Sequence, residues 1–529
     1  MPCTGMRASD RSSGNFFRRR SAAILICFHL PFQQMETPDS GSNKKGFGLL
    51  ILSISLATFM ASLDGTIVNI ALPTISESFK ISTTTVSWVA TSYLLVMVGC
   101  LLVFGKISDT IGYKKIFLSG FAIFTLGSLF CGILPEIVLG FPSLVVSRMF
   151  QAVGGAMIMS VAAAMISTYI PMEQKGKAMS IIMLFAALGT AIGPTIGGIL
   201  TQYLSWHWIF FINVPVGIFA ILLGAKVIPA SQPVPGHGGF DRLGAGLAFV
   251  GLASLVFVVS EGESMGWTSP IILCTTVLAV VTLAWFVRQE LGVADPLLDI
   301  RLFKNRNFFL TNLLLCLVFL SFSGINYLLP FYLEYVHSYD TSTAGLIMTS
   351  LSFAMMVAGL IAGVTFNRVG ARWLCILACI PLIVGYYMMT QLHVYTSTGF
   401  VVGSLALIGF GLGLIVTPAT TMIMMAVSKT KAGMISSLTS LERTAPLTIG
   451  IAIFNLLLIE GVIRIAKNYD VTSKSPADIQ VQVLSAGFDL AFVLSLVLGI
   501  VILIIALVVK VEIHPDYAEE GETPAVDVL

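Results

Sequence analysis

The chain has 529 residues, of which 56% are hydrophobic and only 11% are charged, and its formal net charge is +2. Soluble proteins carry roughly 25% charged residues, and here the apolar residues come in long blocks. This composition excludes an ordinary soluble domain and is typical of a protein that crosses a lipid bilayer many times. The basic residues are scattered in pairs between the apolar blocks, so we expect no nucleic-acid partner.

The first 46 residues precede the first long apolar block. Arg18-Arg19-Arg20 and the apolar run 21–30 imitate a secretory signal, but the run is too short to span and no small-x-small cleavage site follows. Met35 then opens a polar segment of the kind expected before a first membrane helix. Two interpretations stay open: Met35 is the true start, or residues 1–46 form a cytoplasmic tail that is disordered or lies on the membrane surface.

Long apolar segments divide the rest of the chain. A spanning helix needs ~20 apolar residues, and this length yields fourteen predicted spans. They cover 47–73, 86–105, 114–134, 142–169, 178–203, 207–228, 242–261, 268–288, 308–332, 343–365, 372–391, 399–427, 433–463 and 486–510. The sequence therefore predicts an all-α polytopic membrane protein, and the even number of spans places both termini on the same side.

The loops between these spans differ in their content of Lys and Arg. With the N-terminus inside, 18 basic residues fall on the cytoplasmic side, and four (Lys80, Arg464, Lys467 and Lys474) fall outside. Cytoplasmic loops are enriched in Lys and Arg. We therefore expect a multi-pass protein of the cell membrane with both termini in the cytoplasm.

A ten-residue pattern occurs twice, each time in a predicted cytoplasmic loop. Gly105-Lys-Ile-Ser-Asp109-Thr-Ile-Gly112-Tyr-Lys114 is matched by Gly363-Val-Thr-Phe-Asn367-Arg-Val-Gly370-Ala-Arg372 at an offset of 258 residues. Repeated halves typify transporters that rock around a central site. We predict two six-helix bundles (47–229 and 306–511), a linker with two extra helices (230–305) and a C-terminal cytoplasmic tail (512–529).

Asp64 follows a segment, 47–63, that carries no charge. A charge at membrane depth costs at least ~2.5–3.5 kcal/mol, so its default interpretation is functional. With a rise of 1.5 Å per residue, Asp64 lies ~24 Å along the first helix and Arg148 lies ~9 Å below the outer end of the fourth. The two charges thus reach a similar depth and are natural partners. The alternatives are a headgroup-level Asp64 and an Arg148 that snorkels to the surface.

Every histidine lies in a loop, in a terminal tail or, like His207, at the end of a predicted span, so a proton carrier here should be a carboxylate. Asp64 is the first candidate. Glu442 is the second, although it is adjacent to Arg443 and the preferred alternative is that it simply neutralises that arginine.

Glycines mark two further motifs. In the first loop copy, Gly105 and Gly112 permit tight turns, and Asp109 can pair with a base or with the positive N-terminus of a helix. The alternative is a solvated loop. In the fifth span, Gly189, Gly193 and Gly197 recur every four residues beside Gly198, which lets two helices approach closely. Pro194 favours a kink in this helix, and ordinary packing is the alternative for the glycines.

In this order, the motifs resemble those of the major facilitator superfamily, and most closely its fourteen-helix drug:proton antiporter branch. The stretches that carry the resemblance are 63–73, 105–117, 148–156, 189–198, 206–217 and 296–308. The resemblance implies that the loop motif (Gly105, Asp109, Gly112, Lys114) latches the two halves on the cytoplasmic side. It implies that Arg148 takes part in proton coupling. It also implies that the fifth helix seals the two halves and that Asn69, Gln151, Asn213 and Arg443 line the cavity.

Two positions depart from the family pattern. Tyr113 stands where the family usually carries a base, so the latch is expected to be weaker or to use Lys114 alone. Glu442, followed by Ala445-Pro446, replaces the usual glutamine and glycines.

The function expected from this resemblance is proton-driven export of small lipophilic or cationic compounds by alternating access, by a monomer. No phosphate-binding loop occurs, so energy should come from the proton gradient. No metal site or cofactor is expected, because none of the eight cysteines has metal-ligand spacing with a histidine. The alternatives are a dedicated exporter of one metabolite, such as an amino acid or siderophore, and, with less support, a membrane sensor, an integral-membrane enzyme or a channel.

Overall fold

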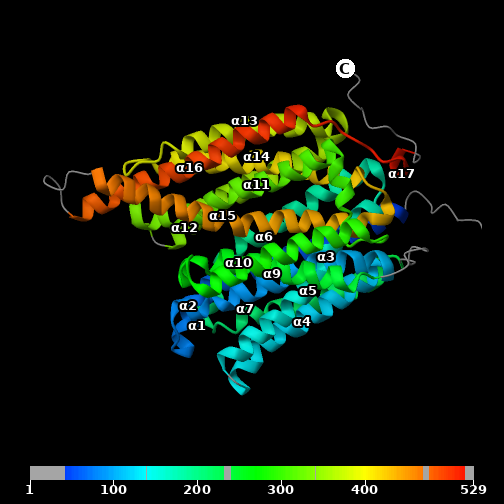
Figure 1. The fold of residues 1–529 in the computed structure, drawn as a ribbon, viewed down its shortest axis with the longest axis horizontal. Helices are drawn as coiled ribbons and strands as arrows, with labels where there is room; N and C mark the ends of the chain where they lie inside the picture. Colours follow the sequence, from blue (N-terminus) through cyan, green and yellow to red (C-terminus); the bar gives the residue numbers. More distant parts are fainter. Residues whose placement is uncertain (1–41, 139, 231–239, 340, 469–475, 519–529) are drawn as a thin grey trace, which may run out of the picture. The chain divides into compact units, whose positions relative to one another are not determined.

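The computed structural model describes residues 42–138, 140–230, 240–339, 341–468 and 476–518. Fourteen helices in these ranges are long and apolar enough to cross a membrane, as the sequence predicted. From Phe47 onward the chain forms one compact unit, and its long helices run side by side (Figure 1). The choice between a start at Met1 and at Met35 concerns residues outside the described ranges.

Helices are the expected outcome for such a sequence, because in lipid every backbone N–H and C=O must find its partner within the segment. The first group of helices covers residues 42–227. Its members are α1 (Ser42–Phe79), α2 (Thr83–Val86), α3 (Trp88–Ile111), α4 (Tyr113–Ile137), α5 (Phe141–Tyr169), α6 (Met172–Tyr203), α7 (Trp208–Phe211) and α8 (Asn213–Val227).

An inserted pair and a second group complete the described chain. The pair is α9 (Arg242–Met265) and α10 (Pro270–Gly292). The second group is α11 (Arg306–Phe331), α12 (Thr341–Val369), α13 (Ala371–Met389), α14 (Thr398–Met425), α15 (Ala432–Asn468), α16 (Pro476–Val508) and α17 (Pro515–Ala518). Side chains cap several of these helices; Asn305, for example, accepts hydrogen bonds from the backbone N–H groups of Asn307 and Phe308 at the start of α11.

The first helix is longer than predicted. Its span was expected to end at Pro73, yet α1 continues to Phe79 with Pro73 inside it. Ile75 is fully buried in a small apolar cluster with Trp206 and Phe210, and this packing holds the last turns in place. Asp64 therefore lies in the middle of a long helix and not near its end.

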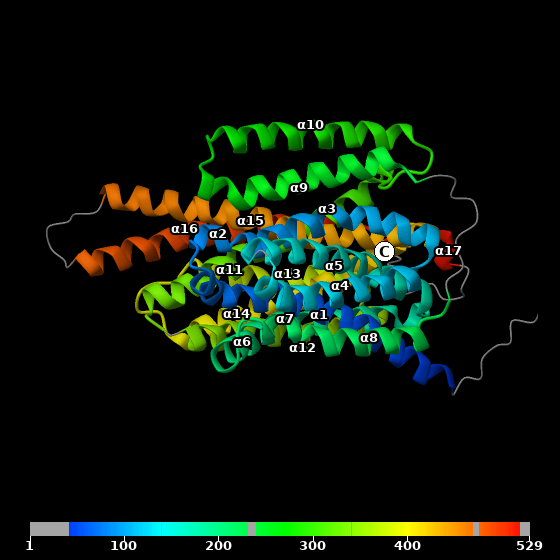
Figure 2. The ribbon, with the colours of Figure 1, turned by 90° about the horizontal axis from the view of Figure 1, so that it is seen from below.

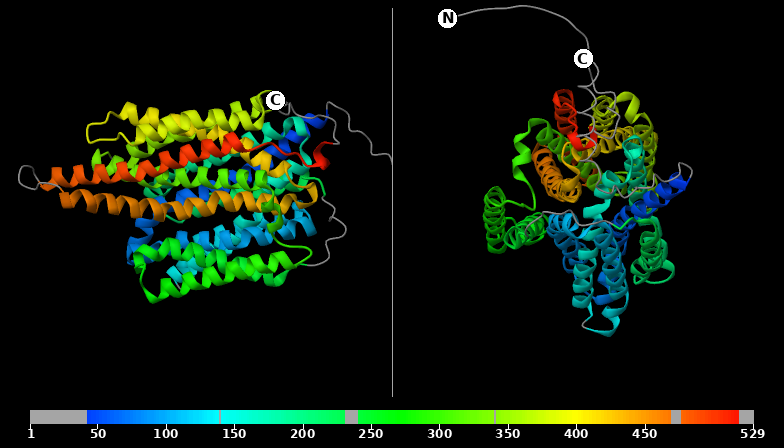
Figure 3. Two further views of the ribbon diagram at one scale, coloured as in Figure 1. Left: turned by 45° about the horizontal axis from the view of Figure 1, so that its top comes forward. Right: turned by 90° about the vertical axis from the view of Figure 1, so that its right-hand side faces the viewer.

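The two groups of helices meet along two seams. One seam joins α3 to α15 and the other joins α6 to α12. Viewed end-on, the helices of the first group (blue to teal) and those of the second (yellow to red) gather on different sides (Figure 3). The inserted helix α9 packs on both α3 and α15, and α10 lies outside it (Figure 2). The boundaries predicted at residues 229 and 306 stay predictions, because residues 47–518 belong to one compact unit.

The two ends of the helices differ in charge. The ends that carry Lys106, Lys114, Lys175, Lys226 and Lys429 lie together, and we call them the basic end. The other ends carry the loops with Tyr339 and Tyr395 and are called the opposite end.

Candidate functional site

Asp64 and Arg148 form an ion pair between α1 and α5. Arg148 Nη1 lies 2.7 Å from Asp64 Oδ2, and the two side chains are 1% and 0% exposed. The pairing expected from their depth in the sequence is what the structure shows. A headgroup position for Asp64 and a snorkelling Arg148 are both wrong, because neither charge reaches the surface.

The second oxygen of the Asp64 carboxylate is also bound. Asp64 Oδ1 accepts hydrogen bonds from Gln151 Nε2 at 2.9 Å and from Asn213 Nδ2 at 3.0 Å. Gln151 and Asn213 are themselves buried. A carboxylate that only accepts hydrogen bonds is matched to its ionised form. The site in this state therefore stabilises the charged carboxylate.

Further groups surround the guanidinium. Arg148 donates to the Gln151 Oε1 atom at 2.6 Å and to the Val89 carbonyl at 3.2 Å. Its charge also lies 4.1 Å from the centre of the Tyr93 ring, within cation–π range. Sequence reasoning missed Tyr93 and Val89, and no motif could have identified them, because α3 contributes them through packing alone.

A close helix contact positions Gln151. A Cβ atom at Gly127 of α4 would lie 2.6 Å from the Gln151 Cα atom of α5, so only glycine permits this approach. The Ser128 hydroxyl next to it accepts a hydrogen bond from Gln151 Nε2 at 2.7 Å. The close contact at Gly127 and the hydrogen bond to Ser128 thus position the Gln151 amide that binds Asp64.

Glu442 and Arg443 do not form a second pair. Within the part of the chain that the structure describes, no ion pair joins them, and Glu442 Oε2 is buried without a hydrogen-bond partner. Arg443 lies over the ring of Phe319 at 5.6 Å instead. Consecutive residues on a helix point about 100° apart, which explains why the predicted local neutralisation is wrong.

Asp109 closes the basic end. Its carboxylate accepts hydrogen bonds from the backbone N–H groups of Gly433 at 2.8 Å and Met434 at 3.0 Å, in the first turn of α15. Tyr113 donates a third bond at 2.9 Å. Of the two partners predicted for Asp109, a base or a helix N-terminus, the structure has the N-terminus, where the helix dipole favours a negative charge. Asp109 is 4% exposed, so the solvated-loop alternative is wrong.

The other loop residues act differently from the prediction. Lys114 does not reach Asp109; its ammonium donates to the carbonyls of Ala225 and Ile228, at the C-terminus of α8. Tyr113, expected to weaken the latch, donates to Asp109 directly from the first residue of α4, across the turn at Gly112. Gly112 has φ +96° at the break between α3 and α4, which confirms the predicted turn.

The glycines of α6 face α1. Cβ atoms at Gly189 and Gly193 would lie 2.5 Å from the Phe59 carbonyl and 2.0 Å from Thr66 Oγ1, and one at Gly197 would meet Ile67. This face therefore packs within the first group, whereas α6 reaches α12 by another face. The helix therefore does join the two groups, as expected, but these three glycines face α1 within the first group. Gly198 faces open space, and the side chain of Pro194 lies outside what the structure describes.

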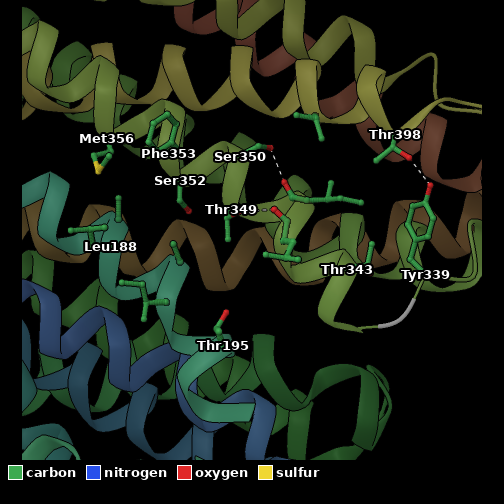
Figure 4. Close-up of a pocket in the computed structure, with 16 residues that line it drawn as sticks. Leu188, Thr195, Tyr339, Thr343, Thr349, Ser350, Ser352, Phe353, Met356 and Thr398 are labelled. Atoms are coloured by element: carbon green, nitrogen blue, oxygen red, sulfur yellow. Dashed lines mark hydrogen bonds between the residues drawn. The ribbon is translucent and has the colours of Figure 1, made fainter. Parts of the chain in front are cut away.

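Two cavities lie between the groups of helices. The larger, about 760 Å³, lies between α6 and α12 towards the opposite end (Figure 4). Apolar residues such as Leu188 and Phe353 line it together with seven hydroxyl-bearing residues, and a hydrogen bond of 2.6 Å between Tyr339 and Thr398 lies at one end. Leu346 and Phe353 are 67% and 64% exposed, so the cavity is open to the surface of the protein.

The smaller cavity, about 20 Å³, lies between α1, α5, α6, α14 and α15. Its polar lining residues are Thr58, Thr420, Thr439, Ser440 and Arg443. Of the four predicted cavity residues, only Arg443 lines either cavity. Gln151 and Asn213 bind Asp64 instead, and Asn69 is exposed away from both cavities.

Two groups of membrane helices that meet along two seams, with a buried ion pair inside the first group, define a transporter of the two-bundle class. The chain belongs to the Major Facilitator Superfamily, whose family model matches residues 54–450. It is therefore a multi-pass membrane transporter and not an enzyme, and the resemblance seen in the sequence is confirmed.

Characterised relatives transport or confer resistance to several compounds. Multidrug resistance protein Stp of Mycobacterium tuberculosis is 33% identical over 411 residues, which cover 78% of this chain and 75% of the relative. Riboflavin transporter RibZ of Clostridioides difficile is 31% identical over 407 residues, covering 77% and 87%. Among solved structures, the human organic anion transporter MFSD10 (TETRAN) matches with a TM-score of 0.61 at 13% identity, over 86% of this chain and 99% of that chain. This last similarity shows the fold.

Proposed function

We propose that this protein is a proton-coupled antiporter that exports small lipophilic compounds from the cytoplasm by alternating access. It works as a monomer in the cell membrane, with both termini and the basic end on the cytoplasmic side, and needs no cofactor beyond the proton gradient. The observation that carries the proposal is the fully buried ion pair of Asp64 and Arg148.

A protonatable pair of this kind can couple proton binding to a conformational change. Protonation of Asp64 from outside removes one charge of the pair and weakens its hold on Arg148. The remaining buried cation is then unpaired, which is costly in a low-dielectric interior. A conformation that gives Arg148 other partners becomes favoured, and the halves rock open towards the cytoplasm. Substrate binding there promotes proton release, and the pair forms again.

Asn213 supports this cycle chemically. Its Oδ1 atom is buried and has no hydrogen-bond partner among the described residues, while its Nδ2 atom donates to Asp64. A protonated carboxyl must donate a hydrogen bond as well as accept. Rotation of the Asn213 amide would present Oδ1 to that proton. The same residue can therefore satisfy both protonation states of Asp64.

The cavities favour lipophilic over cationic substrates. None of the sixteen residues that line the larger cavity is charged, and Arg443 is the charged residue that lines the smaller one. A cation would find no carboxylate in either lining. The printed names of the relatives include both multidrug and riboflavin transporters, so a dedicated exporter of one metabolite is the second candidate. A panel of unrelated compounds separates the two, since only the first predicts transport of many.

The test is transport in proteoliposomes under an imposed proton gradient, with a fluorescent lipophilic dye as the probe. Wild type should accumulate the dye only when the gradient is present. Asp64→Asn should lose at least ~90% of gradient-driven accumulation, as expected when a unique coupling group is removed. Glu77→Gln is the matched control, because Glu77 is an exposed carboxylate on the same helix.

The same assay contains the contradicting result. Full gradient-driven accumulation by Asp64→Asn, at wild-type protein content, would remove Asp64 from the coupling mechanism. Accumulation by wild type without any gradient would remove proton coupling altogether.

A further inference from the structure

The segment that follows α16, residues 509–518, runs across the basic end, and we call it the C-terminal strap. Its first half is bound to the second group of helices. The backbone N–H of Lys510 donates to Asn307 Oδ1 at 3.3 Å, and the Glu512 carboxylate accepts from the side-chain amides of Asn305 and Asn307, each at 2.5 Å. These contacts attach the strap to the start of α11.

The middle of the strap is bound to the connection between α14 and α15. The backbone N–H of His514 donates to the Met425 carbonyl at 2.9 Å. The Asp516 carboxylate accepts a hydrogen bond from the Ser428 hydroxyl at 2.5 Å and one from the backbone N–H of Lys429 at 3.2 Å. The hydrogen bond from the Ser428 hydroxyl is the largest of the contacts that hold the pKa of Asp516 below its usual range. The backbone N–H of Lys429 and the nearby side chains of His514 and Lys429 lower it further, so Asp516 is charged at cytoplasmic pH.

The end of the strap enters the first group of helices. Tyr517 is only 2% exposed, although it belongs to a short helix near the end of the described chain. Its hydroxyl lies 2.8 Å from the Ser167 hydroxyl, in the last turn of α5. The ammonium group of Lys175, at the start of α6, lies 4.4 Å from the centre of its ring.

Tyr517 thus touches both groups of helices at once. Lys429, from the second group, lies 5.1 Å from the same ring on which Lys175, from the first group, is placed. Burial of an aromatic side chain and its cation–π contacts are both large among single-residue contributions. When the basic end opens, α5 and α6 must move away from the connection that precedes α15, and these contacts cannot all persist.

We infer that Tyr517 is a second latch of the basic end, a positioning residue that favours the state in which this end is closed. The inference rests on the proposed alternating access. The latch is separate from that of Asp109, because Tyr517 joins α5 and α6 to the strap, whereas Asp109 joins α3 to α15. A transporter with two such latches opens towards the cytoplasm only when both are released.

Cysteine accessibility tests this latch. Ser440 is 6% exposed and lines the small cavity between the two groups, so Ser440→Cys reacts with a water-soluble maleimide only when the basic end opens. The background is a cysteine-free variant that retains transport, in inside-out vesicles. Tyr517→Ala should raise the labelling rate by about tenfold, since aromatic burial and cation–π contacts are lost together. Tyr395→Ala, which changes a tyrosine that is 93% exposed, should leave the rate unchanged.

A second variant covers the case in which Tyr517→Ala does not reach the membrane. Tyr517→Phe keeps the ring over Lys175 and removes only the bond to Ser167, so its labelling rate should lie between wild type and Tyr517→Ala. A labelling rate equal to wild type in every Tyr517 variant that reaches the membrane would overturn the inference. Labelling needs neither substrate nor a proton gradient. A failure of the latch can therefore be told apart from a failure of proton-coupled export.

Discussion

The two copies of the repeated loop pack against facing helices in the same way. A Cβ atom at Gly105 of α3 would lie 2.2 Å from Ser437 Oγ of α15, and one at Gly363 of α12 would lie 2.3 Å from Ser180 Oγ of α6. Each facing serine lies four residues after a glycine, which is Gly433 in α15 and Gly176 in α6. The close approach of backbones is therefore built into both seams.

The two seams differ in charge. The first has Asp109, whose carboxylate binds the N-terminus of α15. The second has Asn367 at the matching position, which brings no charge. The turn glycines Gly112 and Gly370 both have positive φ, +96° and +84°. The two copies thus share their packing geometry and differ in charge at this position, Asp109 against Asn367. The seam between α3 and α15 should respond most strongly to substitution.

The largest difference is expected from adding a methyl group at each seam. A Cβ atom at Gly433 would lie 2.4 Å from Asp109 Oδ1 and 2.7 Å from the Gly105 carbonyl, so backbone must move. At Gly363 the nearest atoms are Ser180 Oγ at 2.3 Å and Ser180 Cβ at 2.9 Å, and the nearest backbone atom, the Gly176 carbonyl oxygen, lies at 3.1 Å, so a smaller backbone shift is needed. Overpacking costs ~1–3 kcal/mol, so Gly433→Ala should raise maleimide labelling at Ser440→Cys by about ten- to a hundredfold.

Gly363→Ala is the matched comparison and should change labelling less than Gly433→Ala does, because the Ser180 hydroxyl can rotate away and the closest remaining atoms lie at 2.9 and 3.1 Å, whereas at Gly433 a backbone carbonyl lies at 2.7 Å. Equal effects of the two alanines would mean that the seams contribute equally and that the ionic latch adds nothing.

An intermediate effect is expected from exchanging the charge. Asp109→Asn weakens bonds to the α15 backbone, and hydrogen bonds to charged groups are worth ~1.5–3 kcal/mol. Labelling at Ser440→Cys should rise by about tenfold. Asn367→Asp is the reciprocal variant, measured in the same vesicles. If the addition of Asn367→Asp restores slow labelling to Asp109→Asn, a carboxylate at either seam has the same effect. The two seams then differ in residue type but not in what a charge contributes.

The smallest effect is expected from Lys114. Its ammonium binds the C-terminal carbonyls of α8 and not the latch, so Lys114→Gln should cost ~0.3–1 kcal/mol of stability. The thermal unfolding midpoint of the purified protein should fall slightly, while the labelling rate stays at the wild-type value. Lys115→Gln, an exposed neighbour, is the control. Faster labelling in Lys114→Gln, with no change in Lys115→Gln, would show that Lys114 does help to hold the basic end closed.

The helices and the main ion pair could be predicted because each depends on a property that is read along the sequence alone. Apolar length determines a span, and a charge inside a span needs a partner of opposite sign, which led from Asp64 to Arg148. The kind of partner that binds Asp109 was also predicted in part, because a helix N-terminus was one of the two options given for it. Only the helix, α15, was unknown.

Predictions failed where the answer depends on which face of a helix meets which neighbour. The spacing of Gly189, Gly193 and Gly197 predicts a close contact but not that α1 makes it. Gln151 and Asn213 were expected to line the cavity, yet they turn towards Asp64. Tyr517 carries no pattern in the sequence at all, since its burial arises from a fold-back of the chain.

The inserted pair α9 and α10 packs along only one of the two seams described above. α9 covers the seam between α3 and α15, and its end is fastened to both helices: Thr91 donates to Glu261 at 3.2 Å, and Asn455 donates to Glu263. The seam between α6 and α12 holds the larger cavity instead. Two seams that are built alike are thereby made unequal, because an inserted helix packs along one and open space lies in the other.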